Sequence, residues 1–177
     1  MPSTARTVKK WVFPPPLYYT GLIRPFAPSG VWLLRVMDDS EFLKRFEDLS
    51  LPFAQWTHQA HVKVGFLYLQ AHPFQQALAK LRKGIKAYNA ANKVPESATS
   101  GYNETTTHAF LHLIAATMAA YGDAMPTPTA DAFCDTHLQL MTRNALRFFY
   151  SPARRMDPRA KTEFVPPDLA PLPSFSP

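Results

Sequence analysis

Apolar residues recur every three or four positions through most of residues 38–150, which is the spacing of one helix face. The clearest run opens at Pro73, whose fixed φ suits a first helical turn, and its apolar positions are Phe74, Ala77, Leu78, Leu81, Ile85 and Tyr88. We find no internal repeat and no alternating run long enough for a sheet. The pattern therefore predicts an all-α fold.

Residues suited to capping stand where the predicted helices begin. A side-chain oxygen there accepts a hydrogen bond from a backbone amide that the helix itself leaves unpaired. The first helix is expected after Asp38, the second from Thr57 until Pro73, the third from Pro73 to Asn89–Asn92, the fourth from Asn103 or Glu104 to Tyr121, and the fifth after Thr129 with Phe133, Leu138, Met141 and Leu146 as its apolar positions. We expect a single compact bundle of about five helices.

Proline separates this helical domain from both ends of the chain. Residues 1–37 contain six prolines mixed with aromatic residues, and the last dozen residues are again rich in proline. Because proline removes an amide donor and restricts φ, regular helices are disfavoured there. We predict an extended N-terminal arm over residues 1–37, a helical domain over 38–165, and a tail over 166–177 that lies extended on the bundle.

The formal net charge of +6 is unevenly distributed. Residues 1–37 carry five basic side chains and no acidic one, whereas residues 38–177 carry 14 basic and 13 acidic side chains. Lys80, Lys83 and Lys86 share one face of the third helix, but no aromatic residues interleave with them. We interpret this face as solvated and expect no nucleic-acid partner.

Three interpretations of the basic arm remain open. It docks a partner or extends a homodimer interface, it is an organelle-targeting peptide, or it is an upstream extension of a domain that starts at Met37. The density of proline argues against the amphipathic helix that targeting peptides form.

Several classes of protein are disfavoured. No apolar run approaches the roughly 20 residues that a membrane-spanning helix needs, so we expect a soluble protein with no membrane partner. The chain has no glycine-rich phosphate loop, and its one cysteine, Cys134, stands in a predicted helix without a neighbouring base. A single cysteine also fits a reducing compartment, which predicts a cytoplasmic location.

The strongest candidate site begins with His58 and His61, which share a face because they stand three residues apart on a helix. Asn103 and Glu104 open a later helix, and if that terminus faces the histidine pair, two imidazoles, a carboxylate and an amide oxygen converge. Two histidines and one carboxylate are the ligands of many non-haem iron sites and some catalytic zinc sites. We therefore expect a divalent metal, iron or zinc, held by His58, His61 and Glu104.

Simpler interpretations compete with this one. Polar residues at helix starts are favoured as caps or by the helix dipole, whatever the function. Glu104, His108 and His112 fall four residues apart, which makes them a second candidate stripe or partly solvated residues beside the apolar face.

Arginines crowd the segment before the tail. A guanidinium from Arg154, Arg155 or Arg159 could clamp a substrate carboxylate in bidentate fashion. The same side chains could instead pair with acids such as Asp157 and Glu163, which is the commoner arrangement.

Three segments, FEDLSLPFAQWTHQAHVKVGFLYL, GYNETTT and FVPPDLAPLP, together resemble a family of small uncharacterised proteins. That family carries a Trp-Thr-His-x-Ala-His-Leu motif, a Gly-Tyr-His-Glu-Thr motif and a Pro-Asp-Leu tail. The resemblance covers residues 42–173 and implies that His58, His61, Tyr102 and Glu104 belong to one site, without indicating a reaction. Asn103 stands where the family has histidine, which removes a potential third imidazole ligand.

The first functional hypothesis is a small metabolic enzyme of oxygenase, lyase or hydrolase type. The metal activates water or dioxygen or polarises a carbonyl group, and Tyr102 donates a hydrogen bond to the bound oxygen. Arg159, Asn103 and His108 are expected to bind a small organic substrate.

Two alternatives stand beside it. Without a metal, His58 or His61 acts as a general base, oriented by Glu104, in an isomerisation or a dehydration. Otherwise the protein is a helical bundle without catalytic activity that binds a partner through its arm.

Overall fold

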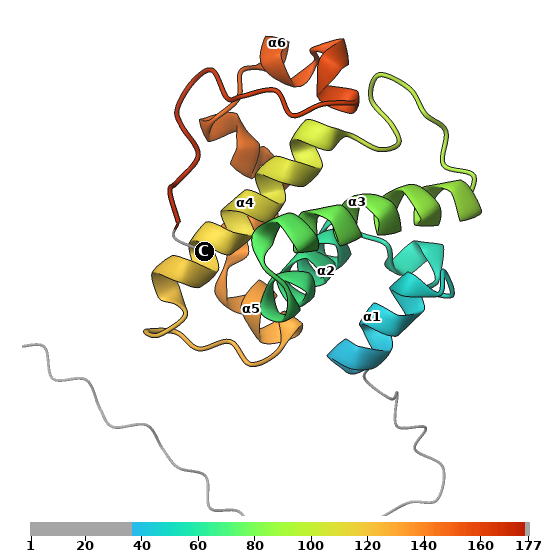
Figure 1. The fold of residues 1–177 in the computed structure, drawn as a ribbon, viewed down its shortest axis with the longest axis vertical. Helices are drawn as coiled ribbons and strands as arrows, with labels where there is room; N and C mark the ends of the chain where they lie inside the picture. The colour runs from blue at the N-terminus through green and yellow to red at the C-terminus, as the bar shows by residue number, and fades with distance from the viewer. Residues whose placement is uncertain (1–36, 176–177) are drawn as a thin grey trace, which may run out of the picture. The chain divides into compact units, whose positions relative to one another are not determined.

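The computed structural model describes residues 37–175, and the predicted arm over residues 1–37 lies outside them apart from Met37. The α-helices are α1 (Asp39–Glu47), α2 (His58–Ala71), α3 (Phe74–Ala91), α4 (Glu104–Tyr121), α5 (Ala130–Thr136) and α6 (Pro152–Arg155). Short 3-10 turns complete the regular structure as η1 (Phe53–Gln55), η2 (Leu138–Leu140), η3 (Arg143–Phe148) and η4 (Pro158–Lys161). Between residues 37 and 175 no strand occurs, so the predicted all-α fold is confirmed (Figure 1). None of the helices described there is long and apolar enough to cross a membrane.

Side-chain caps fix where four of the helices begin, as the sequence predicts. The caps are Asp38, Thr57, Asn103 and Thr129, whose oxygens accept hydrogen bonds from the amides of Glu41, Ala60, Thr106 and Ala132 at 2.8, 3.3, 2.8 and 3.1 Å. Each cap satisfies an amide that has no partner inside its helix. The observed starts of α1, α2, α4 and α5 therefore follow from local chemistry.

The predicted fifth helix is shorter than the apolar spacing indicates. α5 ends at Thr136 because the backbone of His137 leaves the helical region and its ring is buried against Phe133, with ring centroids 4.7 Å apart. The chain then restarts in η2 and η3, and η3 has its own cap, since the Thr142 hydroxyl accepts from the amide of Asn144 at 3.2 Å. A prediction that continues one helix through this region is wrong.

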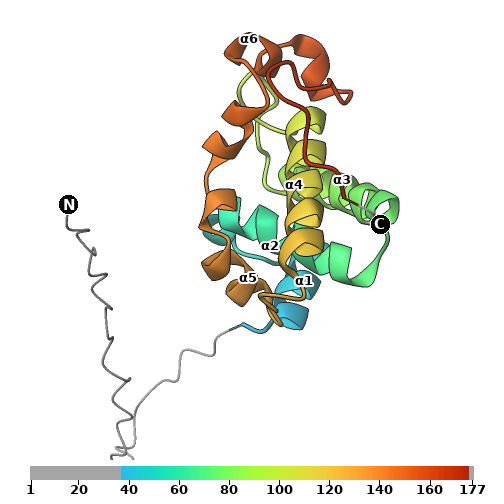
Figure 2. The ribbon, with the colours of Figure 1, turned by 90° about the vertical axis from the view of Figure 1, so that its left-hand side faces the viewer.

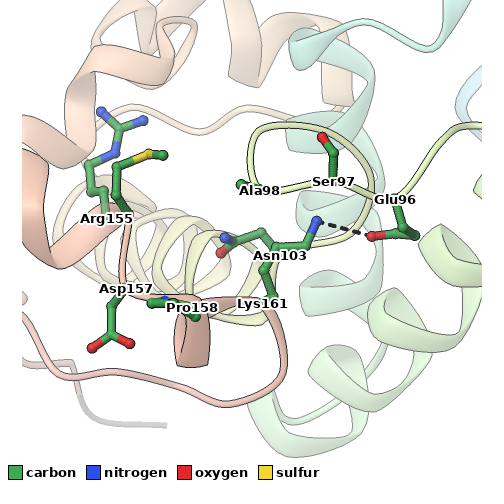
Figure 3. Close-up of a pocket in the computed structure, with 9 residues that line it drawn as sticks. Glu96, Ser97, Ala98, Asn103, Arg155, Asp157, Pro158 and Lys161 are labelled. Atoms are coloured by element: carbon green, nitrogen blue, oxygen red, sulfur yellow. Dashed lines mark ion pairs between the residues drawn. The ribbon is translucent and has the colours of Figure 1, made fainter.

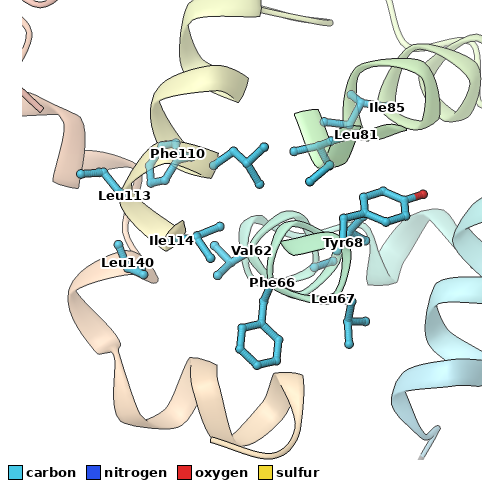
Figure 4. Packing of buried hydrophobic residues seen from close by; sticks show 14 of the residues in the cluster. Val62, Phe66, Leu67, Tyr68, Leu81, Ile85, Phe110, Leu113, Ile114 and Leu140 are labelled. Atoms are coloured by element: carbon cyan, nitrogen blue, oxygen red, sulfur yellow. The ribbon is translucent and has the colours of Figure 1, made fainter. Parts of the chain in front are cut away.

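α2 is the central helix and packs against α3, α4 and α5. Figure 4 shows Val62 near Ile114 of α4, while Phe66 points toward α5, where its ring stacks on Phe133 with centroids 4.5 Å apart. α2 and α4 approach closely at Gly65, where a Cβ would lie 2.9 Å from Cδ1 of Ile114 and would force that side chain to shift. The apolar core therefore lies around α2, and its first turn emerges at the edge of this core.

An aromatic cluster holds α1 against α3. Phe46 is fully buried, and its ring covers Gly84, where a Cβ would lie 2.6 Å from Cε1 of that ring. Phe46 also stacks on Trp56 with centroids 4.7 Å apart, and the ring of Trp56 lies 3.9 Å from that of His61. The packing of α1 therefore supports the position of His61 at the start of α2.

The C-terminal segment folds back over α4 (Figures 1 and 2). The hydroxyl of Thr105 accepts a hydrogen bond from the amide of Val165 at 2.9 Å, and Asp168 accepts from the amide and hydroxyl of Ser151 at 2.9 and 2.6 Å. These bonds hold α6 and η4 at the end of the bundle where α4 begins. Basic residues from the C-terminal segment are thereby brought close to the start of α4.

Candidate functional site

A pocket of about 520 Å³ lies beside the first turns of α2 and α4. Side chains from α2, α3 and α4, from the loop between α3 and α4, and from the C-terminal segment line it. His58 and His61 line it from α2, and Tyr102 and Asn103 line it from the residues that lead into α4. The structure therefore brings four of the predicted site residues to one cavity.

His58 is held by a backbone carbonyl group. Its Nε2 lies 2.9 Å from the carbonyl oxygen of Leu140, and its ring packs edge-on against Phe110 with centroids 4.8 Å apart. Because a carbonyl oxygen only accepts hydrogen bonds, Nε2 carries the proton, and Nδ1 of the neutral ring keeps a lone pair. No described residue hydrogen-bonds Nδ1 of His58.

His61 has the opposite arrangement. Its Nδ1 lies 2.7 Å from the carbonyl oxygen of Thr57, one helical turn earlier, so the proton is on Nδ1 and the lone pair on Nε2. The ring lies against Trp56, which fixes its plane. Among residues 37–175, Nε2 of His61 has no hydrogen-bond partner either. The two rings thus offer one basic nitrogen each.

Burial lowers the pKa of both imidazoles. For His61 burial is the main cause and brings the pKa to about 4, the carbonyl of Thr57 opposes it, and the charges of His58 and Arg143 lower it further. For His58, burial and Arg143 lower the pKa, and the bond to the Leu140 carbonyl raises it. Both rings are therefore neutral at pH 7, the form in which imidazole acts as a base or a metal ligand.

Glu104 is buried, with 5% of its surface exposed, and its carboxylate is engaged by two other residues. Arg82 donates from Nε to both carboxylate oxygens at 2.9 Å and from Nη2 to Oε1, and the hydroxyl of Tyr102 donates to Oε2 at 2.7 Å. Burial raises the pKa of Glu104, but the hydrogen bonds from Arg82 and Tyr102 outweigh it, so the pKa is lowered. Glu104 does not line the pocket, and it anchors α4 to α3.

The predicted three-ligand metal set is not assembled in the described part of the chain. No group of three or more His, Cys, Asp or Glu side chains within residues 37–175 is arranged to hold a metal ion. Glu104 is bound by Arg82, which leaves two imidazoles as ligands. Each imidazole donates a hydrogen bond from one ring N–H to a backbone carbonyl, as metal-bound histidines usually do. Binding of iron or zinc by this chain therefore stays a prediction.

Tyr102 and Asn103 line the pocket, but the Tyr102 hydroxyl and the Asn103 side-chain oxygen already form hydrogen bonds within the protein. The Tyr102 hydroxyl donates to Glu104, and burial together with this carboxylate raises the pKa of Tyr102. The side-chain oxygen of Asn103 caps α4, which leaves its amide nitrogen for a ligand. Asn103 also lines a second pocket of about 330 Å³ beside the first (Figure 3).

Arg159 and His108, both predicted to bind substrate, line neither pocket. Arg159 is exposed and pairs with Asp157 at 2.8 Å and with Glu163 at 3.8 Å, which confirms the competing prediction that it pairs with acids. The ring of His108 packs against Phe164 with centroids 4.1 Å apart, and its Nδ1 is buried without a hydrogen-bond partner in the described residues. The structure places both residues in packing and pairing contacts outside the cavity.

Three further basic residues line the larger pocket: Arg143 of η3, Arg155 of α6 and Lys161 of η4, of which the sequence indicated only Arg155, as one of three candidate arginines. Arg155 belongs to the predicted arginine group, but no local signal distinguishes it from Arg159. Figure 3 shows Arg155 on one side of the second pocket, and Glu96 and Ser97 from the loop between α3 and α4 on the other. The packing of η3 on α4 brings Arg143 to the pocket of the histidine pair, and the return of α6 and η4 over α4 brings Arg155 and Lys161.

No family model matches the chain, and neither a curated protein nor a solved structure matches it. The resemblance suggested by the histidine motif, the GYNET segment and the Pro-Asp-Leu tail therefore stays a prediction.

Proposed function

We propose that this protein is an enzyme that moves a proton on a small organic substrate, with His58 as the general base. The observation that supports this function is the pair of neutral imidazoles in one pocket, each held at one nitrogen by a backbone carbonyl. A fixed imidazole with a bare nitrogen is the usual group for general base catalysis. The pocket of about 520 Å³ is within the size range of small-molecule sites.

The two imidazoles take different parts. A pKa of about 4 makes His61 a weak base at neutral pH, so its Nε2 accepts a hydrogen bond from the substrate and orients it. His58 is shifted in the same direction but is the stronger base, because its ring is less enclosed. General bases work best with a pKa near the working pH, which assigns the proton transfer to His58.

The reaction class follows from one neutral imidazole base beside an apolar wall. Nδ1 of His58 takes a proton from a carbon next to a carbonyl group, and the imidazolium returns it to a neighbouring carbon in an isomerisation or to a leaving hydroxyl in a dehydration. Leu81, Phe110 and Ile114 line the same pocket and limit the access of water to the reacting carbon.

Proton exchange with solvent tests this function directly. The protein is incubated in deuterated buffer with 2-oxo acids, 3-hydroxy acids and their neutral amides, and loss of carbon-bound protons is followed by NMR. We expect H58Q to slow the exchange by about 100-fold or more, and H72Q, which changes a histidine at the end of α2 outside the pocket, to leave it unaltered. Equal exchange by wild type and H58Q would rule out His58 as the base.

A metal-dependent form of the same site is the second candidate, and the orientation of the imidazoles favours it. Both rings present a bare nitrogen while the other nitrogen is bonded to a carbonyl, which is how proteins orient histidine ligands. Metal analysis of protein purified without a histidine tag separates the two candidates. Less than about 0.2 equivalents of any transition metal after reconstitution, with exchange that persists in EDTA, would exclude the metal-dependent form.

A further inference from the structure

The charged groups that line the larger pocket are all basic. Arg143, Arg155 and Lys161 line it together with His58 and His61, and no aspartate or glutamate among residues 37–175 does. The remaining titratable group is Tyr102, whose hydroxyl is bonded to Glu104 behind the wall. Cations that line one cleft attract an anionic ligand more strongly than the same cations scattered over the surface.

Ion pairing shows which of these cations are available to a ligand. Lys161 is 3.0 Å from Glu96, so its charge is largely compensated. Arg154 lies 4.0 Å from Asp168, which identifies it as a partner of the tail. Arg143 and Arg155 have no ion pair with any residue in the described part of the chain. Both guanidinium groups that line the pocket are thus without an acidic partner among residues 37–175.

The positions of these two arginines are complementary. Arg143 is close enough to the histidine pair to act on the charge of both rings. Arg155 lines both the larger pocket and the neighbouring pocket of about 330 Å³, as does Asn103. A ligand in the larger pocket therefore meets a guanidinium beside the imidazoles and another at the junction of the two cavities.

We propose that the larger pocket binds small organic acids, whose carboxylate is held by Arg143 and Arg155 and whose apolar part lies against Leu81, Phe110 and Ile114. Guanidinium groups bind carboxylates through two parallel hydrogen bonds, and the apolar wall accounts for an organic body rather than a bare inorganic ion. The identification of this acid as a substrate rests on the proposed function, whereas its binding does not depend on catalysis.

A bound carboxylate changes the electrostatics of the histidine pair. In the free protein Arg143 disfavours the protonated form of both rings. A carboxylate next to Arg143 compensates that charge and favours the imidazolium form. Binding of the acid is therefore expected to raise the pKa of His58 and His61, and this effect distinguishes the pocket from a binding site elsewhere on the surface.

Titration calorimetry with benzoate and with benzamide, its neutral analogue of the same shape, tests the proposal. We expect benzoate to bind at least about tenfold more tightly than benzamide, and R143Q and R155Q each to weaken benzoate by about fivefold or more. R147Q is the matched control because Arg147 is exposed, belongs to the same η3 helix as Arg143 and does not line the pocket. Phenyl phosphate and inorganic phosphate are measured in parallel to separate carboxylate from phosphate recognition.

Several results would overturn the inference: no benzoate binding at 10 mM, equal binding of benzoate and benzamide, or R143Q and R155Q that bind like R147Q. Tighter binding of inorganic phosphate than of benzoate would equally contradict an organic acid. Circular dichroism confirms that each variant is folded. Because H58Q is expected to retain benzoate binding and to lose proton exchange, failure of the proposed function and failure of this inference give different results.

Discussion

Glu104 is a buried carboxylate that accepts hydrogen bonds from the guanidinium of Arg82 and the phenol of Tyr102. Arg82 reaches it from α3, and the ion pair is the main polar link between α3 and the start of α4. Removing one member of such a pair leaves the other charge buried and poorly solvated. The free-energy cost of that unpaired charge exceeds the free energy lost with the contact itself.

We therefore predict that Arg82→Met lowers the free energy of unfolding by about 2 kcal/mol, a value reduced for the partial exposure of Arg82. Lys83→Met is the matched control, since Lys83 is the next residue of α3 and is exposed. Urea denaturation of both variants is the measurement. If R82M is as stable as K83M, the ion pair does not support the fold as described.

His61 couples stability to pH. Its pKa is lowered to about 4 in the folded chain, so between that value and the ordinary pKa near 6.5 the unfolded chain binds more protons. Stability from this residue is therefore complete above pH 6.5 and falls as the pH falls toward 4. A histidine paired with a carboxylate has the opposite effect, because its contribution to stability is lost as the pH rises.

For His61→Gln we predict a smaller loss of stability in acid. Between pH 7 and pH 5 the wild type should lose about 1 to 2 kcal/mol more than H61Q in its free energy of unfolding. Urea denaturation at the two pH values gives this difference, and H72Q, which changes a histidine outside the pocket, is measured in parallel. Parallel losses in wild type and H61Q would show that His61 is not held neutral by burial.

At the scale of elements, α1 contacts α3 at Gly84, a residue that has no side chain. The ring of Phe46 occupies the space where residue 84 would carry a Cβ, and the ring is fixed from its other side by Trp56 and Tyr88. Overpacking a fixed aromatic ring forces side chains or backbone to shift.

Gly84→Ala is accordingly predicted to destabilise the protein by about 2 kcal/mol, although alanine is the better helix former by about 1 kcal/mol. In the background of Phe46→Leu, which removes the ring, the same substitution should become neutral or stabilising. Thermal and urea denaturation of the two single variants and the double variant form a complete cycle. An additive result would mean that Phe46 and residue 84 do not interact.

Helix starts are predictable from the sequence because their causes lie within three residues. Asp38, Thr57, Asn103 and Thr129 each accept a hydrogen bond from an amide three positions later. The end of α5 is not predictable in this way, since it depends on burial of the His137 ring among side chains that the fold supplies.

The candidate site likewise contains features that local sequence predicts and features that only the tertiary fold determines. That His58 and His61 share a face follows from helical spacing, and the structure does bring both to one pocket. The partner of Glu104 stands 22 residues earlier on another helix, and no periodic pattern indicates it. Arg143 reaches the pocket because η3 packs on α4, and Arg155 reaches it because the C-terminal segment returns across α4; both are properties of the tertiary fold.

At the scale of the whole molecule, the Pro-Asp-Leu segment attaches the C-terminal segment to the bundle. Asp168 receives two hydrogen bonds from Ser151, the cap of α6, and the amides of Asp168 and Leu169 donate to the carbonyl of Phe149. α6 carries Arg155, so this attachment also holds one side of the pocket.

Replacing Asp168 by Asn is predicted to loosen α6 without unfolding the helices of the core. Hydrogen exchange of the amides in residues 149–157 should accelerate by about tenfold, while exchange in α2 stays unchanged. Mass spectrometry of peptides from both regions measures this contrast. Uniform acceleration throughout the chain, or none in residues 149–157, would contradict a local role of the tail.

The central claim is that two neutral imidazoles lie in one pocket, His58 with its lone pair on Nδ1 and His61 with its lone pair on Nε2. Long-range proton–nitrogen NMR of the histidine rings tests this claim most directly. At pH 7 we expect a proton on Nε2 and a bare Nδ1 for His58, and a proton on Nδ1 and a bare Nε2 for His61, with H58Q and H61Q assigning the signals. Two cationic rings, or two rings that exchange between tautomers as free histidine does, would contradict it.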